Sequence, residues 1–271
     1  MSTVTATENR IGGLLRDWRQ RRRLSQMDLA LEAGISTRHL SFVETGRSRP
    51  SPEMVTHLAE QLEVPLRERN QLLLAAGYAP RYETRSLDDP ALKEVRDAVS
   101  RVLGAHEPYP AIAVDRHWNL IASNGALGPM LEGVAPELLV APANTIRLAL
   151  HPQGVAPRII NLGEYRADLL HRLERGARLT GDVRLIELRD EMLGYPGPDA
   201  PPTPPGSAVT VQLRLAPPGG RDRSDGGELT FFSTITTFGT AVDVTVSELS
   251  VEAFFPADPE TAARLVTGDR H

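Results

Sequence analysis

The chain has 271 residues, no cysteine and a formal net charge of −5. This length favours two domains over one, because single hydrophobic cores stop growing well before it. The lack of cysteine excludes disulfides, thiolate metal sites and thiol redox sensing. The N-terminus lacks the apolar core of a signal peptide, and no apolar run approaches the ~20 residues that span a bilayer. We therefore expect a cytoplasmic protein with no membrane partner.

Charge is distributed unevenly along the chain. Between Arg10 and Arg49 there are nine arginines and four acidic residues, whereas the range 85–271 holds 18 basic and 25 acidic residues. This asymmetry indicates an anion-binding N-terminal part and an acidic remainder. Charge alone does not distinguish a nucleic-acid site from a solvated basic surface.

The range 11–76 has the apolar spacing of five short helices. The first carries Ile11, Leu14, Leu15 and Trp18 on one face. Two more lie within 24–46 and are separated by Gly34, which accepts the positive φ that a short turn requires. Because only turns separate these helices, they predict one compact helical bundle.

The third helix of this bundle begins with polar side chains that a small core would exclude. Ser36, Thr37 and Arg38 lie at its N-terminus, where free amides and the helix dipole favour anions. This arrangement predicts a helix-turn-helix whose second helix enters the major groove of DNA. The alternative is an ordinary helical hairpin with a solvated polar face.

Residues 24–62 resemble the lambda-repressor-like, or XRE, family of helix-turn-helix regulators. The resemblance rests on the spacing of Gln26, Gly34, Glu44, Gly46 and Pro50. It implies an internal ion pair between Arg19 and Glu44 and binding to an operator in double-stranded DNA. Phe42 departs from the polar residue common at its position, so its role stays open between a thymine contact and cover for the bundle. By position, the resemblance assigns DNA contacts to Gln26, Ser36, Thr37, Arg38, Ser41, Phe42, Arg47 and Arg49.

The polar range 79–90, with Pro80 near its start and Pro90 at its end, predicts a linker. It separates a DNA-binding domain at 1–78 from a second domain at 91–271. In chain order, the second domain has helical patterns at 92–103, 162–173 and 183–192, a helix capped by Asn124, a proline-rich exposed loop at 195–206, and strand patterns at 111–114, 119–123, 209–215, 228–238 and 249–255. This order predicts an α+β domain with a mostly antiparallel sheet of about five strands.

Two stretches of the second domain resemble known sensor modules. AIAVDRHWNLIASNGA at 111–126 is similar to the start of a PAS domain, and the range 229–262 is similar to the end of an MmyB-like ligand-binding domain. The resemblance implies a PAS-like, MmyB-like domain that binds a small apolar effector, with fatty acids among the class. It implies no other cofactor.

Five of the six phenylalanines lie in the last predicted strands. Aromatic side chains at strand spacing are usually plain core. The alternative is a ligand pocket lined by Phe231, Phe238 and Phe254. In that hypothesis Trp118 lies at the mouth, and Asn124 or Arg147 provides a polar contact.

No catalytic pattern is evident in the chain. The seven histidines show no metal-binding spacing, and neither a GxSxG motif nor a phosphate-binding glycine loop occurs. We expect a sequence-specific DNA-binding transcription regulator, not an enzyme, that acts as a homodimer and senses an effector. Two alternatives stay open: a C-terminal domain that serves only dimerisation or protein interaction, and an antitoxin-like protein.

Overall fold

The computed structural model describes residues 4–199, 211–217 and 227–268. By its internal contacts the chain divides into two compact units. The first contains the N-terminal residues through Ser86 together with Arg178–Gly181 and Thr240–Ser247, and the second contains the rest. The division after Ser86 falls inside the predicted linker at 79–90.

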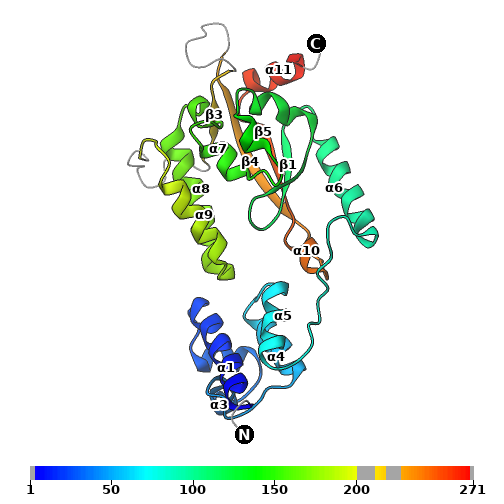
Figure 1. Ribbon diagram of the computed structural model, residues 1–271, viewed down its shortest axis with the longest axis vertical. Coiled ribbons are helices and arrows are strands. Elements are labelled where there is room, and N and C mark those ends of the chain that lie inside the picture. The colour runs from blue at the N-terminus through cyan, green and yellow to red at the C-terminus, as the bar shows by residue number, and fades with distance from the viewer. Residues whose placement is uncertain (1–3, 200–210, 218–226, 269–271) are drawn as a thin grey trace. The chain divides into compact units, whose positions relative to one another are not determined.

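Five helices form the N-terminal bundle, as predicted (Figure 1). Ser25, Ser36 and Ser51 each cap a helix through a side-chain oxygen that accepts a backbone N–H. Buried apolar side chains from all five helices make one core. The helices are α1 (Val4–Arg21), α2 (Gln26–Glu32), α3 (Thr37–Glu44), α4 (Pro52–Gln61) and α5 (Leu66–Ala75).

Gly12 explains the close approach of α1 to α3. A Cβ atom at this position would lie 2.5 Å from the carbonyl oxygen of Glu44 and 2.6 Å from that of Val43. Real Cβ atoms essentially never come that close to backbone atoms, so any larger residue at position 12 forces the two helices apart. The helix that carries the predicted DNA contacts is therefore fixed against α1 by backbone packing.

The second unit contains a five-stranded sheet in the order β2-β1-β5-β4-β3, with every pair antiparallel. The central strand β5 pairs with β1 on one side and β4 on the other, so Ala253 lies beside both Ala111 and Thr234. This confirms the predicted α+β architecture. The strands are β1 (Ala111–Val114), β2 (Leu120–Ser123), β3 (Leu213–Leu215), β4 (Leu229–Thr237) and β5 (Ser250–Pro256).

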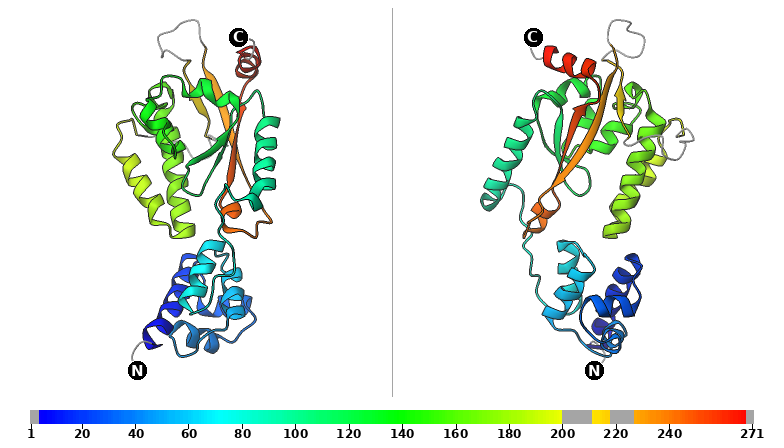
Figure 2. Two further views of the ribbon diagram at one scale, coloured as in Figure 1. Left: turned by 45° about the vertical axis from the view of Figure 1, so that its right-hand side comes forward. Right: turned by 180° about the vertical axis from the view of Figure 1, so that it is seen from behind.

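Helices cover both faces of this sheet (Figure 2). The helix α6 (Lys93–Ala105) packs on one face through Val99 and Leu103. On the other face lie α7 (Thr145–Leu150), α8 (Leu162–Thr180) and α9 (Val183–Leu193), and the larger core is there. Side chains alternate along β5, so Val251 faces the α6 side while Glu252 and Phe254 face the larger core side.

Several elements differ from the sequence prediction. The helix expected after Asn124 is a short 3₁₀ helix, η2 (Gly125–Leu131), with Pro129 inside it. The helices α7, α10 (Val244–Ser247) and α11 (Pro259–Gly268) were not predicted, because they are short or lie beside strand-like patterns. Residues 200–206 of the predicted proline-rich loop and residues 209–210 of the predicted strand lie outside the described part of the chain.

The connection between β4 and β5 belongs to the first unit. The guanidinium of Arg85 donates to the carboxylate of Asp243 at 3.0 Å. The backbone N–H of Val244 donates to the carbonyl of Glu83 at 2.8 Å, and the Thr245 hydroxyl donates to the carbonyl of Arg85 at 2.6 Å. A segment that is continuous with the sheet strands is thereby bound to the chain that follows α5.

Candidate functional site

The turn between α2 and α3 has the geometry of a helix-turn-helix. Gly34 has a φ of 63°, the left-handed conformation that the sequence predicted at this position. The N–H of Ile35 then donates to the carbonyl of Ala30 at 2.9 Å and closes the turn. The side chains of Leu29, Ala30, Leu40 and Val43 are buried in the bundle, so the other face of α3 is left to polar residues.

The exposed face of α3 begins at its first turn. Ser36 is the N-cap, and its Oγ accepts from the N–H of His39 at 3.1 Å. Thr37 and Arg38 follow with exposed side chains, whereas Ser41 and Phe42 are half-buried. The structure therefore places Thr37 and Arg38 where a groove-binding helix presents its base contacts.

Phe42 lies between two arginines of the predicted DNA-binding surface. The guanidinium carbon of Arg38 is 5.3 Å from the centre of the Phe42 ring, and that of Arg47 is 5.9 Å from it. Both separations are within the range of a cation–π interaction. The aromatic ring therefore orients two positive charges, a role that the sequence prediction for Phe42 did not include.

Glu44 is the centre of a buried ionic cluster behind this surface. Its side chain is fully buried and accepts from Arg19 Nε at 2.7 Å and Arg19 Nη2 at 2.9 Å. Gln26 Nε2 donates to the same carboxylate at 2.8 Å, and Arg16 Nε lies 3.5 Å away. Burial raises the pKa of Glu44, but the hydrogen bonds from Arg19 and Gln26 outweigh it, so the net pKa is lowered. The ion pair implied by the family resemblance is present, and Gln26 is held by it.

Arg49 differs from the other predicted DNA contacts. Its Nε and Nη2 atoms donate to the carbonyl of Ala76 at 3.2 and 2.8 Å, and its guanidinium lies 4.9 Å from the centre of the Tyr78 ring. These bonds satisfy a carbonyl at the C-terminal end of α5. The structure thus gives Arg49 a role in holding the bundle together, which the prediction of a phosphate contact had not included.

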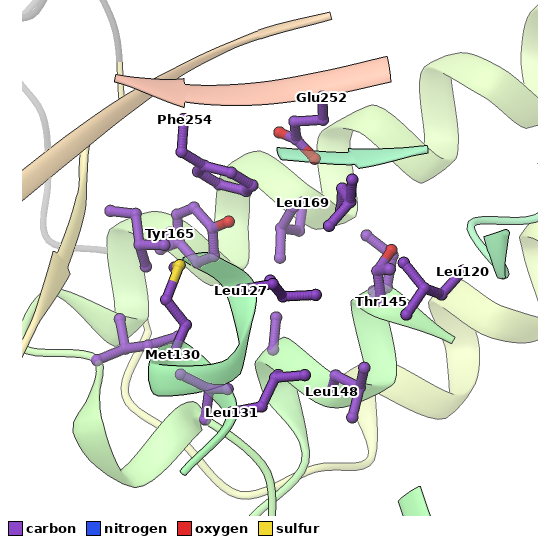
Figure 3. Close-up of a pocket in the computed structure, with 16 residues that line it drawn as sticks. Leu120, Leu127, Met130, Leu131, Thr145, Leu148, Tyr165, Leu169, Glu252 and Phe254 are labelled. Carbon is purple, nitrogen blue, oxygen red and sulfur yellow. The ribbon is translucent and has the colours of Figure 1, made fainter. Parts of the chain in front are cut away.

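A largely apolar cavity lies in the second unit, between the sheet and the segments that cover its larger core (Figure 3). About 620 Å³ of its space is free of protein atoms, and this figure includes the part open to solvent. Its lining side chains are Ile112, Leu120, Leu127, Met130, Leu131, Thr145, Ile146, Leu148, Ala149, Val155, Ile159, Tyr165, Leu169, Leu213, Glu252 and Phe254.

Only three of these lining residues carry a polar side chain. The Thr145 hydroxyl donates to the carbonyl of Trp118 at 3.1 Å. One carboxylate oxygen of Glu252, Oε1, accepts from Arg172 Nη1 at 3.0 Å and from the Ser233 hydroxyl at 2.7 Å. Burial and the nearby Glu252 carboxylate raise the pKa of Tyr165, so this phenol stays protonated.

The predicted phenylalanine pocket is only partly realised. Phe254 lines the cavity. Phe231 is fully buried beside it, with the two rings in an edge-to-face contact at 6.5 Å, and belongs to the core. Phe238 lies one residue beyond the end of β4 and packs against the cluster on the α6 side of the sheet, away from the cavity.

The three predicted polar or mouth residues lie elsewhere. Asn124 is buried and bonds only backbone: its Nδ2 donates to the carbonyls of Leu103 and Tyr109, and its Oδ1 accepts from Ala111 N. Arg147 makes a two-point ion pair with Glu191 at 2.7 Å. Trp118 packs against the larger core and does not line the cavity, although its carbonyl accepts from the Thr145 hydroxyl. The prediction that Asn124 caps the next helix by its side chain is wrong, since this side chain joins β1 to the end of α6 instead.

Two polar residues of the cavity were not predicted from the sequence. Tyr165 lies in the predicted helical pattern at 162–173 and Glu252 in the predicted strand at 249–255, and neither was assigned to the ligand site. A charged residue two positions before Phe254 on a central strand is a signal that was available. Elsewhere, no cluster of three or more potential metal ligands occurs among the described residues, and no helix among them is long and apolar enough to cross a membrane.

Both parts of the chain match family models. Residues 10–72 match a helix-turn-helix domain. Residues 95–267, more than half of the chain, match the MmyB-like transcription regulator ligand binding domain. The chain belongs to the MmyB-like transcription regulator family. This chain therefore contains both a helix-turn-helix domain and the ligand binding domain of a transcription regulator.

Similarity to solved structures is weaker. The clp gene regulator ClgR from Corynebacterium glutamicum is 22% identical, with 38% of this chain and 95% of that chain covered at a TM-score of 0.24. An RNA-binding light-oxygen-voltage receptor is 14% identical, with 97% of this chain and 64% of that chain covered at a TM-score of 0.27. A comparison with curated proteins finds no match. The family assignment therefore rests on the family models and on the geometry described above.

Proposed function

We propose that this MmyB-like regulator binds a specific operator through α3 and that a small apolar effector, held in the cavity of the second unit, changes its affinity for DNA. The observation that carries this proposal is the cavity itself. It is lined almost entirely by apolar side chains and lies within the range that matches the ligand-binding domain. Concave apolar sites with a few convergent polar groups are the usual form of small-molecule sites.

The exposed first turn of α3 supports specific DNA reading. The Arg38 side chain is exposed there, and we infer that it donates two parallel hydrogen bonds to guanine in the major groove, with Thr37 beside it. Arg47 follows the C-terminal end of α3, and we infer that it contacts phosphate. The buried cluster at Glu44 holds this surface in one geometry before DNA binds.

A dimer is the second part of the proposal. Two recognition helices engage successive half-sites when they lie about 34 Å apart, one turn of DNA, and a two-fold pair of chains provides that spacing. Sedimentation of the full-length chain tests this. A strictly monomeric protein at micromolar concentration, with the operator affinity of a fragment that ends at Tyr82, would contradict it.

The connection between β4 and β5 provides a physical route from effector to DNA. It forms part of the first unit, where Asp243 holds Arg85. It also leads directly into β5, which carries Glu252 and Phe254 of the cavity wall. A ligand that shifts β5 therefore acts on a segment bound to the chain after α5. Asp243→Asn is expected to weaken the effect of the effector on DNA affinity, while the protein still binds both the effector and DNA.

The apolar lining supports an apolar effector, and fatty acids are among the class that the family resemblance suggests. A domain that only paired subunits, or one that only neutralised a partner protein, would have no need of a cavity inside its core. Empty space in a core costs stability, because the surrounding atoms lose their contacts.

The test is an operator-binding experiment with the full-length chain. An operator is first selected from random DNA, and its affinity is then measured by fluorescence anisotropy with and without a panel of apolar molecules. Effector coupling typically changes affinity about 5- to 150-fold. We expect a change of this size for at least one apolar molecule and none for polar molecules of similar size. An operator affinity that no apolar molecule alters would refute effector sensing.

A further inference from the structure

Two polar groups inside the cavity have no complete set of partners. Tyr165 is 7% exposed, and its hydroxyl has no hydrogen-bond partner within the described part of the chain. Glu252 is 5% exposed and uses one carboxylate oxygen for Arg172 and Ser233. Its other oxygen, Oε2, accepts no hydrogen bond from any described residue. Buried polar groups are normally satisfied, so unsatisfied ones at a cavity wall indicate where a ligand bonds.

The charge around Glu252 is unfavourable to an anion. Arg172 pairs with Asp168 at 2.7 Å as well as with Glu252 at 3.0 Å. One guanidinium therefore serves two carboxylates, and the cluster keeps an excess of negative charge. A ligand carboxylate placed here would be repelled by Glu252 and would lose its own hydration in an apolar site.

Both groups can bond the same hydroxyl. The protonated Tyr165 phenol can donate and accept, and the Glu252 carboxylate can only accept. A carboxylate head group has no donor for Glu252. An ammonium could donate to both groups but would lose its hydration in an apolar site, whereas an alcohol is neutral and carries a donor and an acceptor on one atom. Figure 3 shows both groups directed into the same apolar space, with Tyr165 extending from α8 and Glu252 from β5.

We propose that the cavity takes a neutral apolar molecule with a hydroxyl group, and that Tyr165 and Glu252 select this hydroxyl against carboxylate and ammonium head groups. The inference rests on the proposed effector site and narrows its ligand to the class of apolar alcohols. The hydroxyl donates to Glu252 Oε2 and accepts from Tyr165, while the hydrocarbon part fills the space among the leucines of the cavity.

The test uses three probes with the same eight-carbon chain: 1-octanol, octanoate and octylamine at pH 7.5. The affinity of the full-length chain for each is measured by calorimetry and by the rise in melting temperature with ligand concentration. We expect octanol to bind at least about tenfold more tightly than octanoate, and more tightly than octylamine. Octanoate or octylamine binding as tightly as octanol would overturn the assignment while leaving effector sensing intact.

Single-group variants sharpen the test. Tyr165→Phe removes only the hydroxyl. It is expected to lower the affinity for octanol about fivefold and to change the affinity for octanoate little. Glu252→Gln removes the charge and is expected to narrow the preference for octanol over octanoate by about tenfold. Tyr195→Phe is the matched control, because Tyr195 does not line the cavity and its hydroxyl is bonded to Glu191 at 2.6 Å, so its loss should leave the preference unchanged. Equal effects of all three variants would overturn the assignment.

A result in which no probe binds would overturn this inference. The operator experiment then decides separately whether effector sensing fails too. If apolar molecules of another class still alter operator affinity, the proposed function stands and only the alcohol assignment is lost. If none does, both are refuted.

Discussion

The predicted DNA-binding surface and the cavity differ in whether their buried polar groups are fully hydrogen-bonded within the protein. In the N-terminal unit the buried carboxylate of Glu44 accepts from Arg19 and Gln26 and lies beside Arg16, and it is satisfied by the protein itself. In the second unit Tyr165 and Glu252 keep bonding capacity directed into the cavity. The first arrangement fixes a surface for a constant partner, DNA. The second is the arrangement that we propose for a small-molecule effector that binds reversibly.

The largest expected effect on stability is at Glu44, because the N-terminal unit depends on this one carboxylate to pair the buried Arg19. Glu44→Ala leaves Arg19 buried without its partner, and breaking such a pair typically costs about 3–5 kcal/mol. We expect the N-terminal unit to unfold first, seen in Trp18 fluorescence of a chain in which Trp118 is replaced by Phe. Glu32→Ala, at an exposed site on α2, is the control. Equal stability of the two variants would contradict the role of Glu44.

The same carboxylate gives a pH dependence of known sign. Its pKa in the folded state is lowered below the ordinary value of 4.5. The stability it contributes is therefore fully present above about pH 4.5 and is lost as the pH falls through the folded-state pKa. Glu44→Gln should flatten the acid side of the Trp18 unfolding curve. An unchanged acid slope in that variant would show that other groups control it.

The second prediction separates two arginines of the DNA-binding surface. Arg38→Ala should lower the preference for operator over random DNA by about 1–3 kcal/mol, because it removes the proposed base contact. Arg47→Ala should lower the affinity for operator and for random DNA equally, and it should reduce the slope of log K against log salt by about one. Anisotropy across a salt series measures both. If Arg38→Ala lowers the two affinities equally, base reading moves to Thr37, Phe42 and Gln26.

The third prediction uses the two faces of the sheet. Phe254→Trp adds bulk inside the cavity and should block the effector at a cost of about 1–3 kcal/mol or less. Phe238→Trp adds the same bulk on the α6 side, outside the cavity, and should leave effector binding intact. Calorimetry with an apolar ligand compares them, with circular dichroism to verify folding. Loss of the effector in both variants would indicate a general loss of packing.

The smallest effect is expected at Phe42. Phe42→Leu removes the ring that lies beside Arg38 and Arg47, at about 0.5–1 kcal/mol for each cation–π contact. Operator affinity should therefore fall a few-fold, whereas Phe42→Tyr keeps the ring and should bind almost as the unmodified chain does. Anisotropy at fixed salt is sufficient. If the Leu and Tyr variants bind equally well, the ring does not orient the arginines.

The two regions also differ in how far the sequence predicts them. The helix-turn-helix depends on local spacing: Gly34 takes the positive φ that its position requires, and Ser36 caps the next helix. The cavity is lined by residues from elements that are far apart in the sequence. The sequence around Tyr165 or Glu252 therefore does not reveal that either residue lines it. Asn124 misleads for the same reason. Its position predicts a cap, but the fold brings backbone atoms of Leu103 and Tyr109 within its reach.

The central claim, that one protein couples an effector cavity to DNA binding, is tested most directly by measuring the coupling in both directions. Operator affinity is measured with and without 1-octanol, and octanol affinity with and without saturating operator, on the same full-length chain. Because binding free energies are linked, both ratios must show the same factor. We predict an equal factor, about fivefold or more, that Phe254→Trp abolishes. Measurable octanol binding with a factor of one in both directions would contradict the account.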